Sequence, residues 1–283
     1  MSRILVAGAA GMLGRDVVTR ASERGYDVIA VDLPELDITD QAAVARMVAD
    51  RRPVAIINCA AWTDVDGAET HEAAALELNG AAAGNLARAA SAHDALLVHV
   101  STDYVFDGAA ATPYVESDAP APQTAYGRTK LAGERAVALA GSQHAIVRTA
   151  WLFGPGGRNF VATMLALAAE RDEVAVVADQ IGCPTYSGHL AGALLDLAEQ
   201  RSSGIHHVAG GGQCSWSEFA SEIFAQAGSS CKVRPVASSE FPRPAPRPAW
   251  SVLVSERPET PRLPPWRDGL AEYLAHASQA VGR

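Results

Sequence analysis

The first 24 residues place a short apolar run, a glycine-rich turn and a helical pattern directly after one another. Residues 4–7 predict a buried strand, residues 8–14 have the spacing Gly-x-x-Gly-x-x-Gly, and the helical pattern continues to about Arg24. Glycines let a backbone approach a diphosphate closely, and a helix N-terminus offers it free N–H groups. We therefore expect a strand, phosphate-binding loop and helix, with an ordinary glycine turn as the alternative.

Apolar strands and helical stretches continue to alternate through the first half of the chain. Further strands are predicted at residues 28–31, 54–58, 96–100 and 145–148, with alanine-rich helices near 72–92 and 126–140. Strands that are apolar along their whole length are typical of a parallel sheet covered on both faces. The sequence thus predicts an α/β fold with a doubly wound parallel sheet.

Asp32 ends the strand predicted at 28–31. This is about the separation from the glycine turn at which an acidic side chain meets the ribose hydroxyls of a dinucleotide's adenosine. A carboxylate there would repel a 2′-phosphate, which favours NADH. An ordinary aspartate in a turn after a strand is the alternative.

The pattern is less regular after residue 151. We expect a helix near 159–170, a strand near 174–178, a helix at 187–200, a strand at 205–208, and helices near 216–227 and 268–280. Residues 241–250 contain four prolines. Composition favours a disordered tether for this segment, whereas its position inside a compact domain favours an ordered binding loop.

Charge and cysteine content exclude several functions. The net charge of −9 argues against nucleic acid or an anionic membrane as a partner, since both attract clustered cations. The four cysteines have neither Cys-x-x-Cys nor Cys/His ligand spacing, so neither a zinc site nor a disulfide framework is predicted. No leader pattern precedes the first strand and no apolar run approaches the length of a membrane span, so we expect a cytoplasmic protein.

Tyr126 and Lys130 have the i, i+4 spacing that places two side chains on one face of a helix. Lys130 is one of only two lysines in the chain. A lysine ammonium is a compact charge that can sit beside a phenol and depress its pKa. We therefore predict a proton-donating tyrosine with its supporting cation, and an exposed packing pair is the alternative.

Ser101 and Thr102 directly follow the strand predicted at 96–100. Ligands of open α/β sheets bind at the carboxyl ends of the strands. A hydroxyl there can orient a carbonyl that Tyr126 protonates, while hydride comes from a nicotinamide. Hydroxyls that only cap the end of the strand are the alternative.

With these residues in place, the chain resembles the dTDP-4-dehydrorhamnose reductase family, within the extended short-chain dehydrogenases/reductases. The resemblance covers most of the chain. Its closest passages are residues 8–14, 36–40, 57–66, 100–108, 126–134, 148–154 and 179–185, of which the last three are specific beyond the superfamily.

The resemblance implies a role for individual residues. Thr102, rather than Ser101, matches the family's hydroxyl position, and Tyr126 and Lys130 match its proton donor and cation, which also contact the cofactor. The other residues that match the dinucleotide site are Gly8, Gly11, Met12, Leu13, Gly14, Asp32, Leu33, Asp37, Ile38, Ala60, Ala61, Trp62 and Thr63. Those that match the sugar-nucleotide pocket are Val65, Asp103, Tyr104, Trp151 and Asn159.

The resemblance also implies an architecture and a reaction. The expected division is a Rossmann dinucleotide-binding domain at 1–150, joined by about 187–208, and a smaller α/β substrate domain at about 151–186 and 209–283. The expected reaction is reduction of the C4 ketone of dTDP-4-dehydro-L-rhamnose to dTDP-L-rhamnose. Members use NADH or NADPH, so Asp32 indicates a preference, and the chain is expected to be a monomer or a homodimer.

Two departures leave alternatives open. Residues 247–251 read Arg-Pro-Ala-Trp-Ser where members usually have Arg-Pro-x-Asn-Ser, and Val254 stands where an Asp often follows. The substrate could therefore be another dTDP-linked deoxysugar. Some relatives form a magnesium-linked dimer, but only Asp16 stands near such a position, so no metal is predicted. A non-catalytic regulatory subunit that binds a dinucleotide is the alternative from another class, and the intact catalytic set counts against it.

Overall fold

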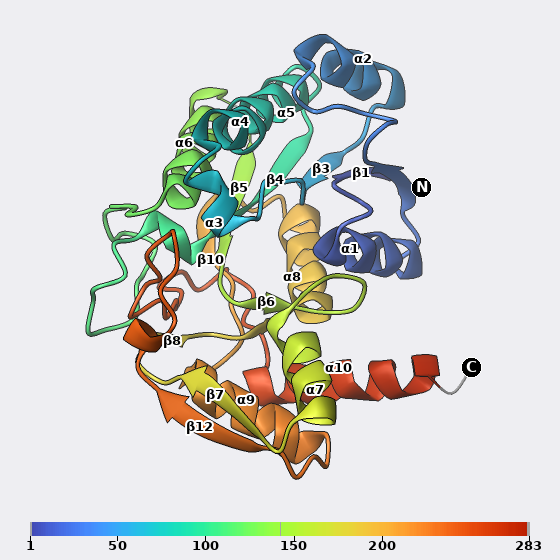
Figure 1. Cartoon of the computed structure of the whole chain (residues 1–283). Helices are drawn as coiled ribbons and strands as arrows, with labels where there is room; N and C mark the ends of the chain where they lie inside the picture. The colour runs from blue at the N-terminus through green and yellow to red at the C-terminus, as the bar shows by residue number, and fades with distance from the viewer. Residues whose placement is uncertain (1, 142, 282–283) are drawn as a thin grey trace.

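A six-stranded parallel sheet is the framework of the molecule (Figure 1). The computed structural model describes residues 2–141 and 143–281, of which 277–281 by backbone alone. The strand order is β10-β5-β4-β3-β1-β2, and every neighbouring pair is parallel. The strands are β1 (Arg3–Ala7), β2 (Asp27–Val31), β3 (Ala55–Asn58), β4 (Leu96–Thr102), β5 (His144–Thr149) and β10 (Gly204–His207). The predicted doubly wound parallel sheet is confirmed.

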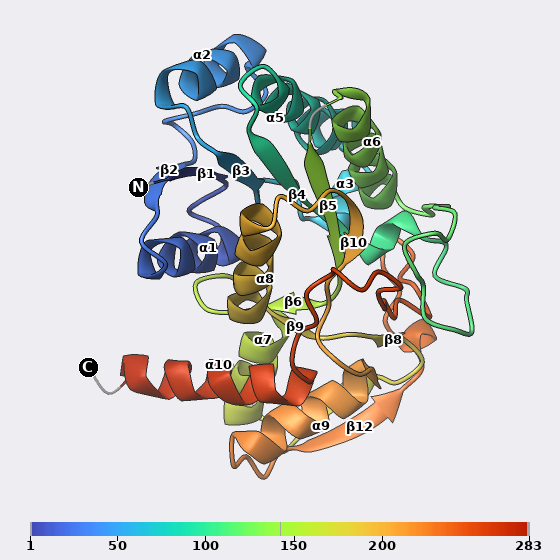
Figure 2. The ribbon, with the colours of Figure 1, turned by 180° about the vertical axis from the view of Figure 1, so that it is seen from behind.

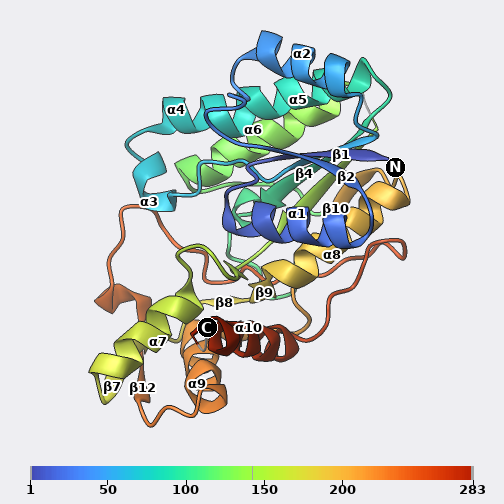
Figure 3. The ribbon, with the colours of Figure 1, turned by 90° about the vertical axis from the view of Figure 1, so that its right-hand side faces the viewer.

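Helices cover both faces of this sheet, as the edge-on view shows (Figure 3). On one face, α1 (Met12–Glu23) and α8 (Ser187–Glu199) bury apolar residues at helical spacing, such as Leu13, Val17 and Leu194. On the other face lie α2 (Gln41–Arg51), α5 (Ala82–Ser91) and α6 (Ala125–Leu139). Because both faces are covered, the central strands β1, β3, β4 and β5 are buried along most of their length and are mainly apolar.

The helix predicted at 72–92 is interrupted. It consists of α4 (Glu72–Leu76), a π-helix at Glu77–Ala81 and α5. The π-helix contains Asn79, whose side chain accepts a hydrogen bond from Trp62 N at 2.8 Å and donates one to Thr129 Oγ1 at 3.1 Å. These contacts join three separate segments, which explains why helical pattern alone could not predict the break.

A second group of elements packs around its own aromatic core, below the sheet in Figure 1 and seen from behind in Figure 2. Phe153, Phe219 and Trp266 are buried at its centre. Its elements are β6 (Leu152–Phe153), α7 (Phe160–Glu170), β7 (Glu173–Val177), β8 (Ile181–Gly182), β9 (Thr185–Tyr186), β11 (Cys214–Ser215), α9 (Trp216–Gln226), β12 (Lys232–Val236) and α10 (Trp266–Val281). In the described part of the chain, no helix is both long and apolar enough to cross a membrane. Neither α2 nor β12 was predicted from the sequence.

The proline-rich segment 241–250 is an ordered loop. Arg247 donates two hydrogen bonds to the carboxylate of Asp66, at 2.9 and 2.8 Å, and Ala245 N donates to the same carboxylate at 3.2 Å. Ala245 is fully buried, and Trp250 N donates to Gly108 O. The disordered tether is therefore wrong and the segment is ordered, whereas its role as a binding loop stays a prediction. Asp66 belongs to the short helix α3 (Val65–Ala68), beside the cavity described next.

Candidate active site

A cavity of about 710 Å³ opens at the carboxyl ends of the central strands. This is where ligands of open α/β sheets bind. Nearly all residues predicted for the site line it, although they come from segments far apart in the chain. They are Gly8, Gly11, Met12, Leu13, Gly14, Asp32, Leu33, Asp37, Ile38, Ala60, Ala61, Thr63, Val65, Thr102, Asp103, Tyr104, Tyr126, Lys130 and Trp151.

Two predicted site residues do not line this cavity. Trp62 stacks on His71, and its indole N–H donates to Asp64 O at 2.9 Å. Asn159 caps α7 by accepting a hydrogen bond from Ala162 N, and its amide donates to Gly154 O and Gly157 O. Both side chains therefore hold the backbone of the site in shape.

The glycine turn fits a phosphate group. An added Cβ at Gly14 would lie inside 3.0 Å of Gly8 O, and one at Gly8 inside 3.0 Å of Ala60 N. The N-cap of α1, Gly11, has no capping side chain, so the first N–H groups of the helix remain available. The close packing of backbone and the uncapped helix start fit the diphosphate of a dinucleotide.

We expect Gly14→Ala to weaken dinucleotide binding by about 5-fold to 150-fold, because the methyl group must push the turn away from α1, at a cost of about 1–3 kcal/mol. Calorimetric titration with NADH measures this. Gly192→Ala in α8 is the matched control, since its added Cβ meets only Arg24 Nη2, at 3.8 Å. Equal affinities in the two variants would contradict the role of the turn.

Asp32 connects β2 to the glycine turn. One carboxylate oxygen accepts a hydrogen bond from Ala10 N and the other from Leu33 N, both at 2.9 Å. The half-buried side chain also borders the cavity. The carboxylate therefore shapes the turn and is placed where a ribose hydroxyl could reach it.

Tyr126 and Lys130 lie on one face of α6, as their spacing predicts. The N-cap of α6 is Thr124, whose hydroxyl accepts a hydrogen bond from Gly127 N at 3.0 Å. The Lys130 ammonium donates to Val100 O at 2.7 Å, which fixes it against the end of β4. Burial lowers the pKa of Lys130 to about 8, and the charges of Glu134 and Cys59 oppose this shift.

The pKa of Tyr126 is raised, whereas the sequence led us to expect a lowered pKa. Burial and the nearby Asp103 carboxyl raise this pKa, the Thr102 hydroxyl lowers it, and the resulting pKa is about 12. The prediction that Lys130 depresses this pKa is therefore wrong for the chain alone, because desolvation of the phenolate dominates. The shift keeps the phenol protonated at neutral pH, which is the form that donates a proton.

The two hydroxyls at the end of β4 have different surroundings. Ser101 Oγ donates to buried Glu134 at 2.6 Å, whereas Thr102 Oγ1 donates to Asp103 Oδ1 at 2.8 Å, close to Tyr126. Burial raises the pKa of Asp103 to about 6, and its hydrogen bond with Thr102 lowers it. In the described part of the chain, Asp103 Oδ2 and Thr149 Oγ1 are buried without a hydrogen-bond partner. Since both residues line the cavity, these oxygens fit a polar ligand.

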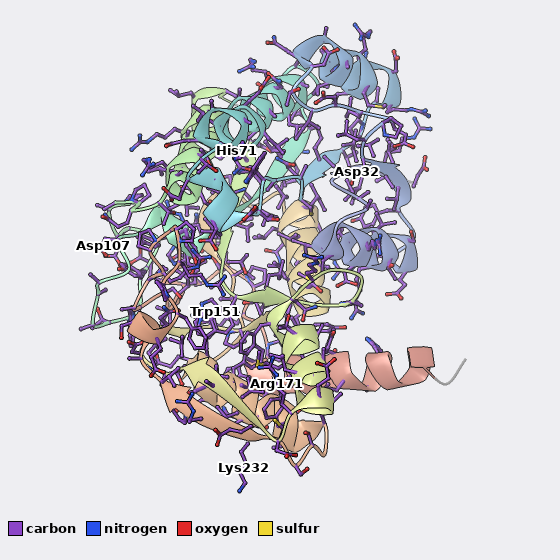
Figure 4. All side chains as sticks on the ribbon, in the orientation of Figure 1. Asp32, His71, Asp107, Trp151, Arg171 and Lys232 are labelled. Atoms are coloured by element: carbon purple, nitrogen blue, oxygen red, sulfur yellow. The ribbon has the colours of Figure 1, made fainter. Side chains whose placement is uncertain are left out.

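Trp151 is held in a strained conformation at the cavity. Its φ of 46° is in the left-handed region, and its indole stacks on Trp216 with ring centroids 3.5 Å apart. Gly182 leaves the space for this ring, since an added Cβ would lie inside 3.0 Å of it. In Figure 4, Trp151 lies between the sheet and the lower helices. Backbone strain of this kind clusters at ligand-binding positions.

Several residues that were not predicted for the site also line the cavity. They are Val31, Leu36, Cys59, Leu78, Val100, Ser101, Thr149, Ala150, Leu152, Gly157 and Arg158. Most are apolar residues at strand ends or in turns, and the sequence carries no signal that separates them from core residues. Arg158 could have been found, because it follows the glycine-rich run 154–157.

Comparison with known proteins agrees with this geometry. The model of the RmlD substrate binding domain family matches residues 1–279. The chain belongs to this family. RmlD-family relatives include a dTDP-4-dehydrorhamnose reductase of Streptomyces griseus, 44% identical over 99% of this chain and 96% of its own. A probable dTDP-4,6-dihydroxy-2-methyloxan-3-one 4-ketoreductase of Streptomyces antibioticus is 46% identical over 95% of this chain and 94% of its own.

A solved RmlD-family structure has the same fold. It is the dTDP-4-dehydrorhamnose reductase of Bacillus anthracis in complex with NADP, with a TM-score of 0.94 and 40% identity over 98% of this chain and all of that one. The expected family resemblance is thus confirmed over nearly the whole chain.

Proposed function

We propose that this chain reduces the C4 ketone of a dTDP-linked 4-keto-6-deoxy sugar with NADH or NADPH. The preferred substrate is dTDP-4-dehydro-L-rhamnose, and the product is dTDP-L-rhamnose. The observation that carries the proposal is the convergence of Thr102, Tyr126 and Lys130 on a cavity that also contains the glycine turn. The family membership and the names of the relatives at 44–46% identity support the same reaction.

Thr102, Tyr126 and Lys130 each have a separate role in proton transfer. A reduced nicotinamide supplies the hydride when it is bound. When the ketone binds, the Thr102 hydroxyl would turn from Asp103 Oδ1 and donate to the ketone oxygen, which it orients and polarises. The Tyr126 hydroxyl gives that oxygen its proton, so that ketone, hydride and proton yield one secondary alcohol. The Lys130 ammonium stabilises the negative charge that then develops on the phenol oxygen.

The sugar nucleotide is proposed to bind between the two groups of elements. Residues 1–150 with about 187–208 would hold the dinucleotide, and about 151–186 with 209–283 would hold the dTDP sugar. Val65, Asp103, Tyr104 and Trp151 line the shared cavity on this side. The protein is expected to work in the cytoplasm, as a monomer or a homodimer, without a membrane or nucleic-acid partner.

A second candidate is a 4-ketoreductase for another dTDP-linked deoxysugar. The Streptomyces antibioticus relative carries such a name. Trp250 also replaces the usual asparagine in the loop that Arg247 joins to Asp66. The non-catalytic regulatory subunit is less favoured, because a binding module has no need of a buried, protonated phenol.

The test is oxidation of NADH and NADPH in the presence of dTDP-4-dehydro-L-rhamnose, with chromatographic identification of the product. Formation of dTDP-L-rhamnose would support the preferred substrate. Turnover only with other 4-keto sugars would support the second candidate, and dinucleotide binding without any turnover would support the regulatory alternative.

We expect kcat/KM to fall as the pH rises through about 8, where buried Lys130 loses its proton. Below this pH the ammonium and the phenol are both protonated, as proton donation requires, and kcat/KM reports groups of the free enzyme. Rates measured across this range test the prediction. The decline should move to higher pH in Lys130→Arg, whose guanidinium stays charged. A flat profile in the unaltered chain would contradict it.

A further inference from the structure

The loop at residues 154–159 brings an arginine to the cavity from outside the six-stranded sheet. Arg158 borders the cavity beside Gly157 and is exposed. Within residues 2–141 and 143–281, it forms no hydrogen bond or ion pair. Its guanidinium is therefore available to a ligand.

The loop is fixed against the first turn of α1. Arg15 Nη1 donates to Gly156 O at 3.5 Å, and an added Cβ at Gly157 would lie 3.0 Å from Met12 Cβ. Behind the loop, the amide of Asn159 holds Gly154 O at 2.8 Å and Gly157 O at 3.1 Å. Arg158 is thus held next to the glycine turn and the uncapped start of α1.

Acidic side chains outnumber the basic ones that border the cavity, so a bound diphosphate has few cations to pair with. Asp32, Asp37 and Asp103 border the cavity, whereas Lys130 is buried and already donates to Val100 O. The first turn of α1 contains no acidic residue. A planar guanidinium suits the oxygens of a phosphate, and the pair is strong where the geometry is fixed.

We propose that Arg158 binds the diphosphate of the dinucleotide and completes the phosphate site that the glycine turn begins. The inference rests on the proposed function, because it takes the dinucleotide as the ligand of this cavity. It adds a cofactor contact from the loop that leads into α7. The diphosphate of a dTDP sugar has the same chemistry, and the contact of the neighbouring Gly157 with Met12, at the start of α1, favours the dinucleotide.

Calorimetric titration of Arg158→Ala tests the proposal. We expect its Kd for NADH to rise about tenfold and to depend less on salt, since one charge-assisted contact is lost. Its Kd for dTDP should stay unchanged. Arg171→Ala is the matched control: it removes the same charge from an exposed position at the other end of α7 (Figure 4), and both affinities should remain those of the unaltered chain.

Two outcomes would overturn the inference. In one, Arg158→Ala binds NADH as tightly as Arg171→Ala does. In the other, it loses affinity for dTDP alone, which would assign Arg158 to the sugar nucleotide. In either case, turnover by the unaltered chain would still support the proposed function. If the unaltered chain binds no dinucleotide, both the proposed function and the role of Arg158 are contradicted.

Discussion

Tyr126→Phe should lower kcat by about 10³-fold while the chain still binds its dinucleotide. The phenol is the group placed to protonate the ketone oxygen, and burial holds its pKa at about 12, so it is protonated at neutral pH. Phenylalanine keeps the ring, including its edge-to-face contact with Tyr104 at 5.5 Å, and removes only the hydroxyl. Steady-state kinetics and NADH titration on the same preparation measure the two quantities separately.

Tyr26→Phe is the control for loss of a phenolic hydroxyl. Tyr26 OH donates to Glu199 at 3.1 Å, on the α8 side of the sheet, and Tyr26 does not line the cavity. We expect this variant to retain full turnover. Full reductase activity in Tyr126→Phe would show that Tyr126 is not the proton donor and that another group supplies the proton.

Arg148→Met should destabilise the fold by about 3–5 kcal/mol, because it leaves the carboxylate of Glu134 buried without its ionic partner. Arg148 donates to the two oxygens of Glu134 at 2.9 and 2.7 Å, and their side chains are only 2% and 4% exposed. Ser101 would remain as a hydrogen-bond donor to Glu134. Urea unfolding, which reports the free energy of unfolding, measures the loss.

Arg128→Met provides a matched surface comparison. Arg128 makes an equally close pair with Glu72, with two contacts of 2.8 Å, but both side chains are more than 40% exposed. Its loss should cost less than about 1 kcal/mol. Combining Arg148→Met with Glu134→Leu should recover much of the lost stability, since an apolar pair replaces the buried charge. Equal costs for Arg148→Met and Arg128→Met would contradict the argument.

The sequence alone determined the features that depend on neighbouring residues. The strand, glycine turn and helix at the N-terminus follow from residues 4–24, and the parallel sheet follows from the repeated apolar runs. The shared face of Tyr126 and Lys130 follows from helical spacing. Such features can be read locally because strand and helix periodicity are properties of short segments.

Only the tertiary structure decided how distant segments act on one another. It packed Gly157 against Met12 of α1 and thereby brought the next residue, Arg158, to the cavity. It ordered the loop at 241–250 through Asp66, which lies about 180 residues earlier in the chain. It also raised the pKa of Tyr126, because desolvation depends on everything packed around the phenol. Burial and long-range contacts arise from the folded whole, so no local pattern encodes them.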